Sequence, residues 1–347
     1  MTSNIRSLYD LYAAKLIPSD RVRPLVEVVE RYPVALTEAM AGLIDRDRPE
    51  DPIARQFVPT MLELDARSHE EVDPIGDDSH SPVRGVVHRH PDRILLKATG
   101  VCPVYCRFCF RKEMVGPQAK REMTAIDLQR AAEYVAGHPA IREVIVTGGD
   151  PFVLSAERIR SITETFSAIP HVRILRWHTR VPLVAPSKVT DAFVGALATD
   201  RCAIFVAIHA NHAREFTDEG RAAIRRLRQI GVSLLGQTVL LQGVNDNIRS
   251  LSELMMAFVE AGVKPYYLHH PDLARGTGHF RVSLKKGVAL MDELRRSVTG
   301  LALPTYVLDL PGGIFKVPLP GACSFGEDGT VELKDPFGNI HLYRDAL

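Results

Sequence analysis

Three cysteines lie close together in the sequence, at Cys102, Cys106 and Cys109. They follow an aliphatic run, residues 94–99, that is typical of a β-strand, so we expect a loop at the carboxyl end of that strand. Thiolates are soft ligands that suit zinc or an iron-sulfur cluster. A cubane cluster usually takes four cysteines, so three on one short loop leave one metal position open for another ligand.

A structural zinc site is the alternative interpretation of this loop. A site of three cysteines and one histidine would need His88 or His90, and both precede the strand instead of following the loop. A chance grouping of core cysteines is the third possibility. The other two cysteines, Cys202 and Cys323, stand alone in an odd total of five, which is not the pattern of a disulfide framework. We therefore expect reduced thiols.

A glycine pair follows the next predicted strand, in the sequence Thr147-Gly148-Gly149-Asp150. Such a pair can expose backbone N–H groups to a ligand, and the carboxylate can meet an ammonium group. The alternative is a glycine-rich turn that caps a helix, which is common. The position of the pair, one strand after the cysteines, favours a role in binding.

A lysine near the C-terminal end of the chain, Lys316, lies in the sequence DLPGGIFKVP of residues 309–318. Lysine is rare among apolar neighbours unless it is paired or takes part in chemistry. Apolar surroundings lower the pKa of the amine and make it nucleophilic, as lysines that form Schiff bases require. The alternative is a surface turn whose lysine points to solvent.

The elements that must position these groups alternate between strands and helices. The β-rich runs are residues 94–99, 143–147, 173–179, 203–209, 233–241, 264–269 and 304–308. Amphipathic stretches between them include residues 126–137, 157–167, 219–230 and 250–261. This alternation predicts an α/β fold with a parallel sheet, either doubly wound or a partial or full parallel (β/α) barrel of about six strands. The polar motifs follow strand ends, which favours the barrel.

Three segments are expected along the chain. Residues 1–85 form a helical N-terminal appendage and linker, with helices near 5–16, 24–30 and 36–44 and a linker rich in Asp, Ser, Pro and Gly at 73–82. Residues 86–325 form the barrel and carry the site. Residues 326–347 are a C-terminal tail.

Composition narrows the class of partner. The 43 Lys and Arg residues nearly cancel the 42 Asp and Glu residues, so no strong field points to nucleic acid or to an anionic membrane. The first twenty residues contain no unbroken apolar stretch, which argues against a secretory signal, and the other apolar runs are too short to cross a membrane. We expect a cytoplasmic protein that acts on a small molecule.

Over residues 88–325 the chain resembles the lysine 2,3-aminomutase family of radical S-adenosylmethionine enzymes. The spacing Cys-x3-Cys-x2-Cys, with an aromatic residue before the last cysteine, is the signature of the superfamily. The family resemblance runs through residues 90–93 (HPDR), 102–111 (CPVYCRFCFR), 148–150 (GGD), 209–212 (HANH), 237–246 (QTVLLQGVND), 265–267 (PYY), 272–273 (DL), 278–281 (GHFR) and 309–316 (DLPGGIFK).

The resemblance implies a role for each matched residue. It implies that Cys102, Cys106 and Cys109 hold a 4Fe-4S cluster, and that Lys316 is the catalytic lysine that carries pyridoxal 5'-phosphate. The other implied roles are phosphate binding by Arg93, S-adenosylmethionine binding by Gly148, Gly149, Asp150, His209 and Gln237, carboxylate binding by Arg111, and binding of the substrate's side-chain ammonium by Asp272 and Asp309. Arginine suits carboxylates and phosphates, and two aspartates suit one ammonium. Taken singly, each residue could also be part of an ordinary ion pair.

The implied reaction is migration of the α-amino group of L-α-lysine to the β-carbon, which gives L-β-lysine. S-adenosylmethionine then acts as a cofactor that is regenerated, and an electron donor such as flavodoxin or ferredoxin is needed. The alternative is a related aminomutase that supplies β-lysine for modification of elongation factor P, or one that acts on another amino acid. Two carboxylates disfavour glutamate as the substrate. The oligomeric state is left open, a homo-oligomer included.

The chain departs from the family pattern at several positions. Longer members bind zinc through a cysteine where this chain has Asn247 and through a cysteine-rich tail, so we do not expect the zinc site here. The glycine run before the lysine is shortened to Gly312 and Gly313, and His90 stands where tyrosine is usual. The short C-terminus and Phe110 resemble the bacterial branch that makes β-lysine for elongation factor P.

Overall fold

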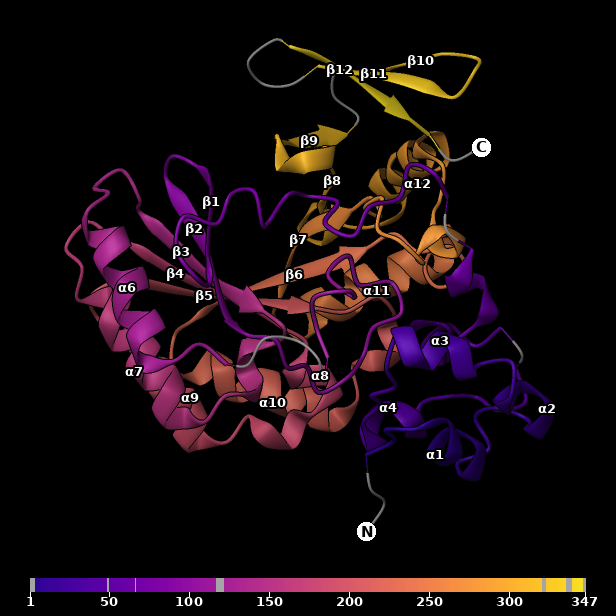
Figure 1. The fold of residues 1–347 in the computed structure, drawn as a ribbon, viewed down its shortest axis with the longest axis horizontal. Coiled ribbons are helices and arrows are strands. Elements are labelled where there is room, and N and C mark those ends of the chain that lie inside the picture. Colours follow the sequence, from indigo (N-terminus) through magenta and orange to yellow (C-terminus); the bar gives the residue numbers. More distant parts are fainter. Residues whose placement is uncertain are drawn as a thin grey trace.

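The computed structural model describes residues 4–345 except 49, 66, 117–121, 320–322 and 335–338. A nine-stranded sheet dominates it, with its strands in chain order from β1 to β9 (Figure 1). The strands are β1 Val86–His90, β2 Arg93–Thr99, β3 Glu143–Gly148, β4 Ile174–Thr179, β5 Ala203–His209, β6 Ser233–Val239, β7 Lys264–His269, β8 Thr305–Asp309 and β9 Lys316–Leu319. Strands β2 to β8 are parallel, and β1 and β9 pair antiparallel at the two edges.

This topology confirms the expected fold class of a parallel (β/α) sheet curved into a partial barrel. Seven parallel strands are present where about six were expected. The edge strands β1 and β9 were not predicted, because each is short and β9 contains a proline. Proline is tolerated at a sheet edge, where its missing N–H costs no hydrogen bond.

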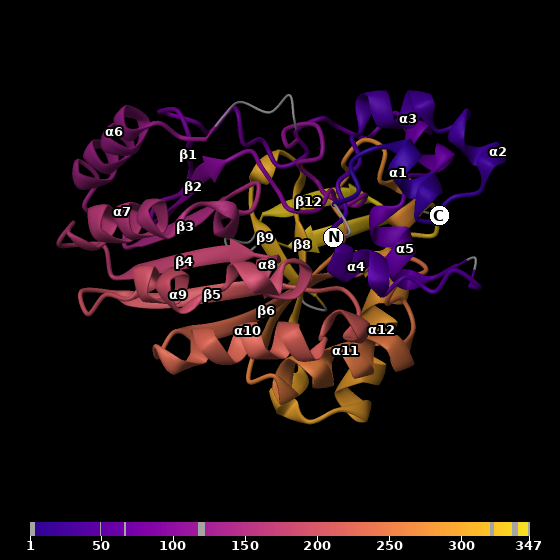
Figure 2. The ribbon, with the colours of Figure 1, turned by 90° about the horizontal axis from the view of Figure 1, so that it is seen from below.

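Helices connect the parallel strands and lie along the outside of the curved sheet (Figure 2). They are α6 Ala125–Ala136, α7 Ala156–Ser167, α8 Val181–Val184, α9 Asp191–Leu197, α10 Asp218–Gln229, α11 Ile248–Glu260 and α12 Leu284–Ser297. A Ser, Thr or Asn side chain caps the N-terminus of all of these except α8. Their apolar faces bury Phe166, Trp177 and Phe258 against the outer face of the sheet.

The N-terminal appendage contains more helices than the three that were predicted. They are α1 Leu8–Ala13, α2 Ser19–Val22, α3 Val26–Arg31, α4 Glu38–Gly42, α5 Pro52–Phe57 and a 3-10 helix, Met61–Leu64. They bury a second apolar core that also includes Val104 and Tyr105 of the cysteine loop and Val184 of α8. The appendage therefore packs directly on the loop that carries the three cysteines.

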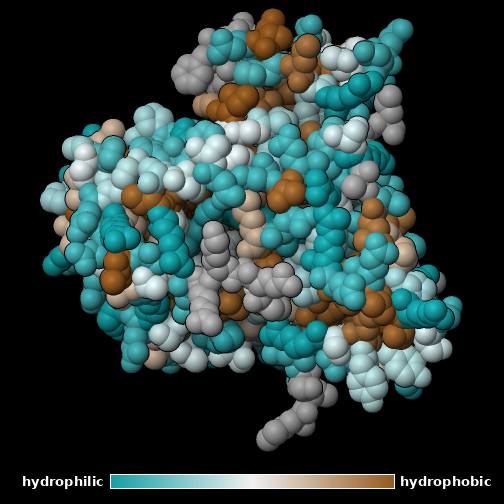
Figure 3. All heavy atoms as spheres, viewed as in Figure 1, coloured by the Kyte–Doolittle hydropathy of each residue, from teal (hydrophilic) through white to brown (hydrophobic). Residues whose placement is uncertain are grey.

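The C-terminal residues form a small antiparallel sheet where the sequence analysis expected only a tail. Its strands are β10 Cys323–Phe325, β11 Thr330–Lys334 and β12 Ile340–Arg344. Val331, Leu333 and Tyr343 join the main core, while Ile340 and Leu342 are exposed. The face drawn in Figure 3 shows apolar residues over this sheet and over the N-terminal helices. Among the described residues, no helix is long and apolar enough to span a bilayer.

Candidate active site

The concave side of the sheet carries polar side chains. Alternate residues of a strand point to opposite faces, and on β4 Leu175 and Trp177 pack under the outer helices. Arg176 and His178 therefore face the interior. His178 is half-buried there, and its buried Nε2 atom has no hydrogen-bond partner among the described residues. A buried polar atom without a partner indicates a place for a polar ligand.

The three cysteines lie together at the carboxyl end of the barrel. Burial raises the pKa of the Cys102 thiol, and the Asp150 carboxylate and the other two cysteines raise it further, so these groups are close neighbours. The side chains of no three His, Cys, Asp or Glu residues in the described ranges are arranged to hold one ion. Cluster thiolates each bind a different iron, whereas the ligands of a structural zinc must converge on one ion. Three soft thiolate donors on one loop fit a 4Fe-4S cluster.

The two histidines of the zinc alternative are engaged elsewhere. The Nδ1 atom of His88 lies 2.8 Å from the Tyr134 hydroxyl, and the His90 ring packs edge-on against Phe315 with the ring centroids 5.9 Å apart. Neither histidine is arranged with the cysteines as a metal ligand.

The glycine pair joins the end of β3 to the cysteine loop. The N–H of Gly149 donates to Thr99 O at 2.6 Å, and the N–H of Asp150 donates to Val101 O at 2.9 Å. A Cβ atom on Gly149 would lie 2.3 Å from Val101 O, so only glycine allows this approach. These N–H groups therefore hold the loop, whereas we expected them to face a ligand.

The Asp150 carboxylate is buried and accepts three hydrogen bonds. The donors are the Thr179 hydroxyl at 2.7 Å, the backbone N–H of Arg180 at 2.7 Å and that of Phe152 at 3.0 Å. Burial nevertheless raises the pKa of Asp150. The carboxylate thus fixes the end of β4 beside the cysteine loop.

A buried carboxylate of the appendage braces the cysteine loop. Glu63 accepts hydrogen bonds from Arg107 Nη2 at 2.6 Å and from Lys112 Nζ at 2.9 Å, and the side chains of all three residues are almost fully buried. Arg107 also donates to the backbone carbonyl of Pro33 at 2.9 Å. These bonds tie both ends of the segment that contains Cys109 to the appendage.

Lys316 lies inside the site and not on a solvent-exposed turn. It begins β9 directly opposite Asp309, the last residue of β8, and its ammonium group bonds to the Asp309 carboxylate. The Nδ1 atom of His269 lies 3.1 Å from the same carboxylate, and the Tyr267 ring lies 5.4 Å from Lys316 Nζ. Lys316 is therefore oriented by residues from two strands, β7 and β8.

The glycine turn before Lys316 requires glycine. Gly312 and Gly313 have φ angles of +73° and +69°, which side chains rarely adopt. A Cβ atom on Gly313 would lie 2.2 Å from Ile75 O and 2.6 Å from an Arg89 guanidinium nitrogen. The turn thus packs against the linker of the appendage and against β1.

Arg111 and Asp272 lie between the cysteines and Lys316. Burial raises the pKa of Asp272 to about 7, and the neighbouring Asp309 adds to this effect, while Lys316 and Arg111 oppose it. Arg111 Nε donates to Asp77 Oδ2 at 2.8 Å. Its charge also lowers the pKa of Cys109, which burial raises to about 11. A continuous set of neighbouring charges therefore connects the cysteine loop to the lysine.

The remaining predicted residues lie deeper in the barrel. Arg93 begins β2, at the end of the strand opposite to the carboxyl end, and pairs with Asp92 at 2.8 Å. Its charge, like that of Lys316, lowers the pKa of His90, which burial lowers most. Gln237 Nε2 lies 2.9 Å from His269 Nε2. The ring of His209 lies 5.7 Å from that of Phe108 in the cysteine loop, and His209 Nε2 lies 3.1 Å from Asn211 Oδ1.

Several residues of the site were missed in the sequence analysis. They are Asp77, Arg89, His178, Arg180 and His269. Asp77 lies within the stretch taken as a linker, residues 73–82, and Arg89 lies in β1 after it. Neither segment carries a sequence signal of burial. His178 and His269 are the last inward-facing residues of two predicted strands, so their place at strand ends was a usable signal.

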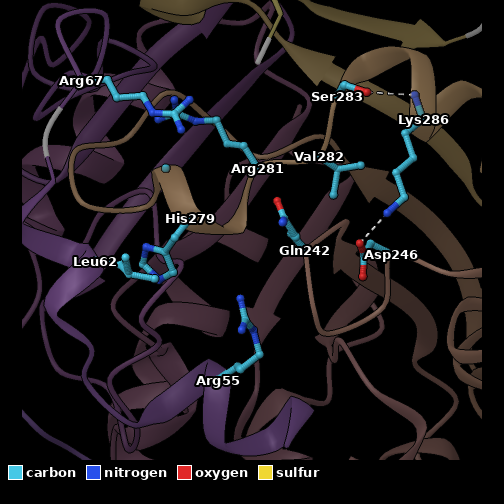
Figure 4. A pocket seen from close by; sticks show the side chains of 11 residues that line it. Arg55, Leu62, Arg67, Gln242, Asp246, His279, Arg281, Val282, Ser283 and Lys286 are labelled. Atoms are coloured by element: carbon cyan, nitrogen blue, oxygen red, sulfur yellow. Dashed lines mark hydrogen bonds and ion pairs between the residues drawn. The ribbon is translucent and has the colours of Figure 1, made fainter. Parts of the chain in front are cut away.

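A pocket separate from the predicted site lies between the appendage and the loops after β6 and β7 (Figure 4). Its volume is about 570 Å³, and no residue of the predicted site lines it. Lys286 pairs there with Asp246 at 2.6 Å, and Arg281 pairs with Glu70 at 2.7 Å. Its cations are thus largely neutralised by carboxylates of the chain.

Comparison with known proteins places the chain in a family. The radical SAM superfamily model matches residues 96–255. The L-lysine 2,3-aminomutase of Clostridium subterminale is 37% identical over 324 residues, which cover 93% of this chain and 77% of that protein. The enzyme of the same name from Escherichia coli (strain K12) is 38% identical over 276 residues, 80% of each chain.

A glutamate 2,3-aminomutase is also similar. The protein of that name from Clostridioides difficile (strain 630) is 34% identical over 293 residues, which cover 84% of this chain and 69% of that protein. Membership of the radical SAM superfamily implies a 4Fe-4S cluster and S-adenosylmethionine. The chain belongs to the lysine 2,3-aminomutase family of radical SAM enzymes, which are isomerases.

Proposed function

We propose that the chain converts L-α-lysine to L-β-lysine by 2,3-amino migration, with pyridoxal 5'-phosphate carried on Lys316. The observation that carries this proposal is the pair of carboxylates beside Lys316. Asp309 bonds to the Lys316 ammonium, and the half-buried Asp272 feels the charges of both, with no ion-pair partner of its own among the described residues. A lysine side chain supplies the ammonium that would neutralise this second carboxylate.

Arg111 is proposed to bind the substrate carboxylate. It is buried between the cysteine loop and Asp272. Asp77 accepts from its Nε atom, and the Thr147 hydroxyl accepts from its Nη1 atom at 3.4 Å, which leaves Nη2 and the second N–H of Nη1 for a carboxylate. Arg111 at one end of the substrate and Asp272 at the other would hold it extended. The β-carbon of the substrate would then lie toward the cysteines.

The cofactors have separate places in this arrangement. When bound, the cluster with S-adenosylmethionine would supply a hydrogen-abstracting radical, and pyridoxal 5'-phosphate would stabilise the substrate radical while the amino group migrates. Cys102, Cys106 and Cys109 would hold the cluster. Residues proposed to surround S-adenosylmethionine are Gly148, Gly149, Asp150, His209 and Gln237, and Arg93 is proposed to bind the coenzyme phosphate.

The fold supports this chemistry by covering the cysteine loop. Trp177 and the other outward residues of the sheet are sealed under helices, and the appendage covers the cysteine loop. A carbon radical must be kept from water and stray hydrogen donors. An electron donor such as flavodoxin or ferredoxin and a cytoplasmic location belong to the same proposal. Supply of β-lysine for modification of elongation factor P is the alternative.

Anaerobic incubation of the reduced enzyme with single amino acids tests the substrate. We expect L-lysine to rearrange and L-glutamate to remain unchanged, as followed by mass spectrometry of derivatised products. Rearrangement of glutamate with lysine untouched would contradict the proposal and would match the glutamate 2,3-aminomutase relative.

Borohydride trapping tests the coenzyme site. We expect pyridoxal bound covalently to the peptide that contains Lys316, and no trapping in K316A. The matched control is K286A, because Lys286 is a partly exposed lysine that pairs with Asp246 outside the site. Trapping that persists in K316A would move the coenzyme to another lysine.

A further inference from the structure

The geometry at Arg180 points to a residue that controls the electron affinity of the cluster site. Arg180 follows β4 and is only 6% exposed. Its Nη1 atom donates to Cys106 Sγ at 3.0 Å. We propose that Arg180 is a positioning residue that holds Cys106 through this bond and raises the reduction potential of the cluster.

The guanidinium of Arg180 is fixed by the appendage and by the loop after β5. Its Nη2 atom donates to Gln56 Oε1 at 2.9 Å and to Glu215 Oε2 at 2.6 Å. The rings of Phe57 and Phe108 lie 5.0 Å and 5.5 Å from its central carbon. Because these contacts already fix the guanidinium of Arg180, it loses little conformational freedom when it also donates a hydrogen bond to the sulfur atom.

Glu215 neutralises the charge of Arg180, and Glu215 is itself held in place by hydrogen bonds. Glu215 is fully buried and accepts from the backbone N–H groups of Asn211 at 2.9 Å and His212 at 3.0 Å. The side chain of Asn211 also donates to Gln56 Oε1 at 3.1 Å. One network therefore joins the cysteine loop, two strand ends and the appendage.

The direction of the effect follows from charge. Reduction adds one electron to the cluster, with no proton transferred, and the cysteine sulfurs carry part of the added charge. A cationic N–H donor stabilises the reduced cluster more than the oxidised one, and hydrogen bonds to sulfur are an established control of cluster potential. Arg180 thus favours reduction of the cluster by the electron donor.

Redox titration of the reconstituted cluster, followed by its electron paramagnetic resonance signal, tests this inference. In R180Q we expect the ratio of reduced to oxidised cluster at a fixed potential to fall about tenfold, which is about 59 mV for a one-electron couple. In E215Q, Arg180 is no longer neutralised, so the potential should rise. Dithionite is the reductant in each titration.

A matched control separates tuning from general damage. Arg214 also forms an ion pair between the barrel and the appendage, with Asp51 at 2.6 Å, but it does not contact a cysteine. R214Q should therefore keep the wild-type potential. If R180Q takes up no iron, R180K is used in its place. Lysine keeps the positive charge but lacks the planar guanidinium, so a smaller fall in the reduction potential is expected.

The outcomes are distinct. Potentials equal to wild type in the Arg180 variant, or shifts of the same sign in the Arg180 variant and in E215Q, would overturn the inference. The inference rests on the proposed cluster site, and wild-type protein reconstituted without bound iron and sulfide would overturn both. Normal iron content with an unshifted potential would overturn the role of Arg180 alone.

Discussion

Asp272 and Asp309 are neighbouring carboxylates with different charge states. Burial would raise the pKa of Asp309, but Lys316 and His269 outweigh it and hold the pKa below its usual range. Burial and Asp309 together raise the pKa of Asp272 to about 7. One carboxylate is therefore ionised throughout the neutral range, and the other changes charge within it.

This difference predicts how lysine binding depends on pH. Asp272 must be ionised to hold the substrate ammonium, so binding is strong above its pKa and is lost as the pH falls below it. We expect kcat/KM for lysine to drop about tenfold per unit below about pH 7. The pH profile of kcat/KM in wild type and in D272N checks this. An unchanged acid limb in D272N would assign the titration to another group.

The turn before the catalytic lysine provides a second prediction at the residue scale. G313A places a Cβ atom at a φ of +69° and against Ile75 O, so we expect the free energy of unfolding to fall by at least about 1–2 kcal/mol. G195A is the matched control, because Gly195 lies inside α9 with nothing within 4 Å of the added atom, and it should stabilise by about 0.5–1 kcal/mol. Urea titrations of both variants measure these changes in the free energy of unfolding.

The Glu63 brace provides a prediction at the scale of elements. E63Q would leave the buried cations of Arg107 and Lys112 without their carboxylate. We therefore expect the free energy of unfolding to fall by about 3–5 kcal/mol, and the protein to take up less iron. E50Q is the control, since Glu50 is 74% exposed in its pair with Arg55 and should change stability by less than about 1 kcal/mol. Equal effects of the two variants would show that the brace contributes little.

At the same scale, the sequence predicted elements better than it predicted their contacts. The seven parallel strands were found because they are aliphatic runs between amphipathic helices. The edge strands β1 and β9 and the C-terminal sheet were missed, because short strands at edges lack a long apolar pattern. The cysteines, Lys316 and both aspartates come together as the strand ends predict, whereas Asp77 and Arg180 act through long-range contacts that no local pattern reveals.

At the scale of the whole molecule, the appendage and the barrel share one stabilising interface. The second apolar core includes Tyr105 of the cysteine loop, and buried ion pairs such as Glu63 with Arg107 cross between the two parts. We therefore expect them to unfold together. We propose that the helical appendage expected from the sequence belongs to the same folding unit as the barrel.

Two probes can check this cooperative unfolding. The single tryptophan, Trp177, lies in β4, so its fluorescence reports on the barrel alone. Hydrogen exchange of the helices α1 to α5 reports on the appendage. We expect both transitions at the same urea concentration. Loss of protection in the appendage while the fluorescence is still native would show that the appendage folds and unfolds by itself.

The central claim is that the cysteine loop and the residues around Lys316 form one site for lysine. Turnover of lysine deuterated at the β-carbon tests it most directly, with mass spectrometry of the β-lysine and of the recovered S-adenosylmethionine. We predict that deuterium enters the 5'-carbon of S-adenosylmethionine and returns to β-lysine, because the proposed site holds the substrate between the cysteine loop and Lys316. S-adenosylmethionine free of deuterium after complete turnover would contradict the claim.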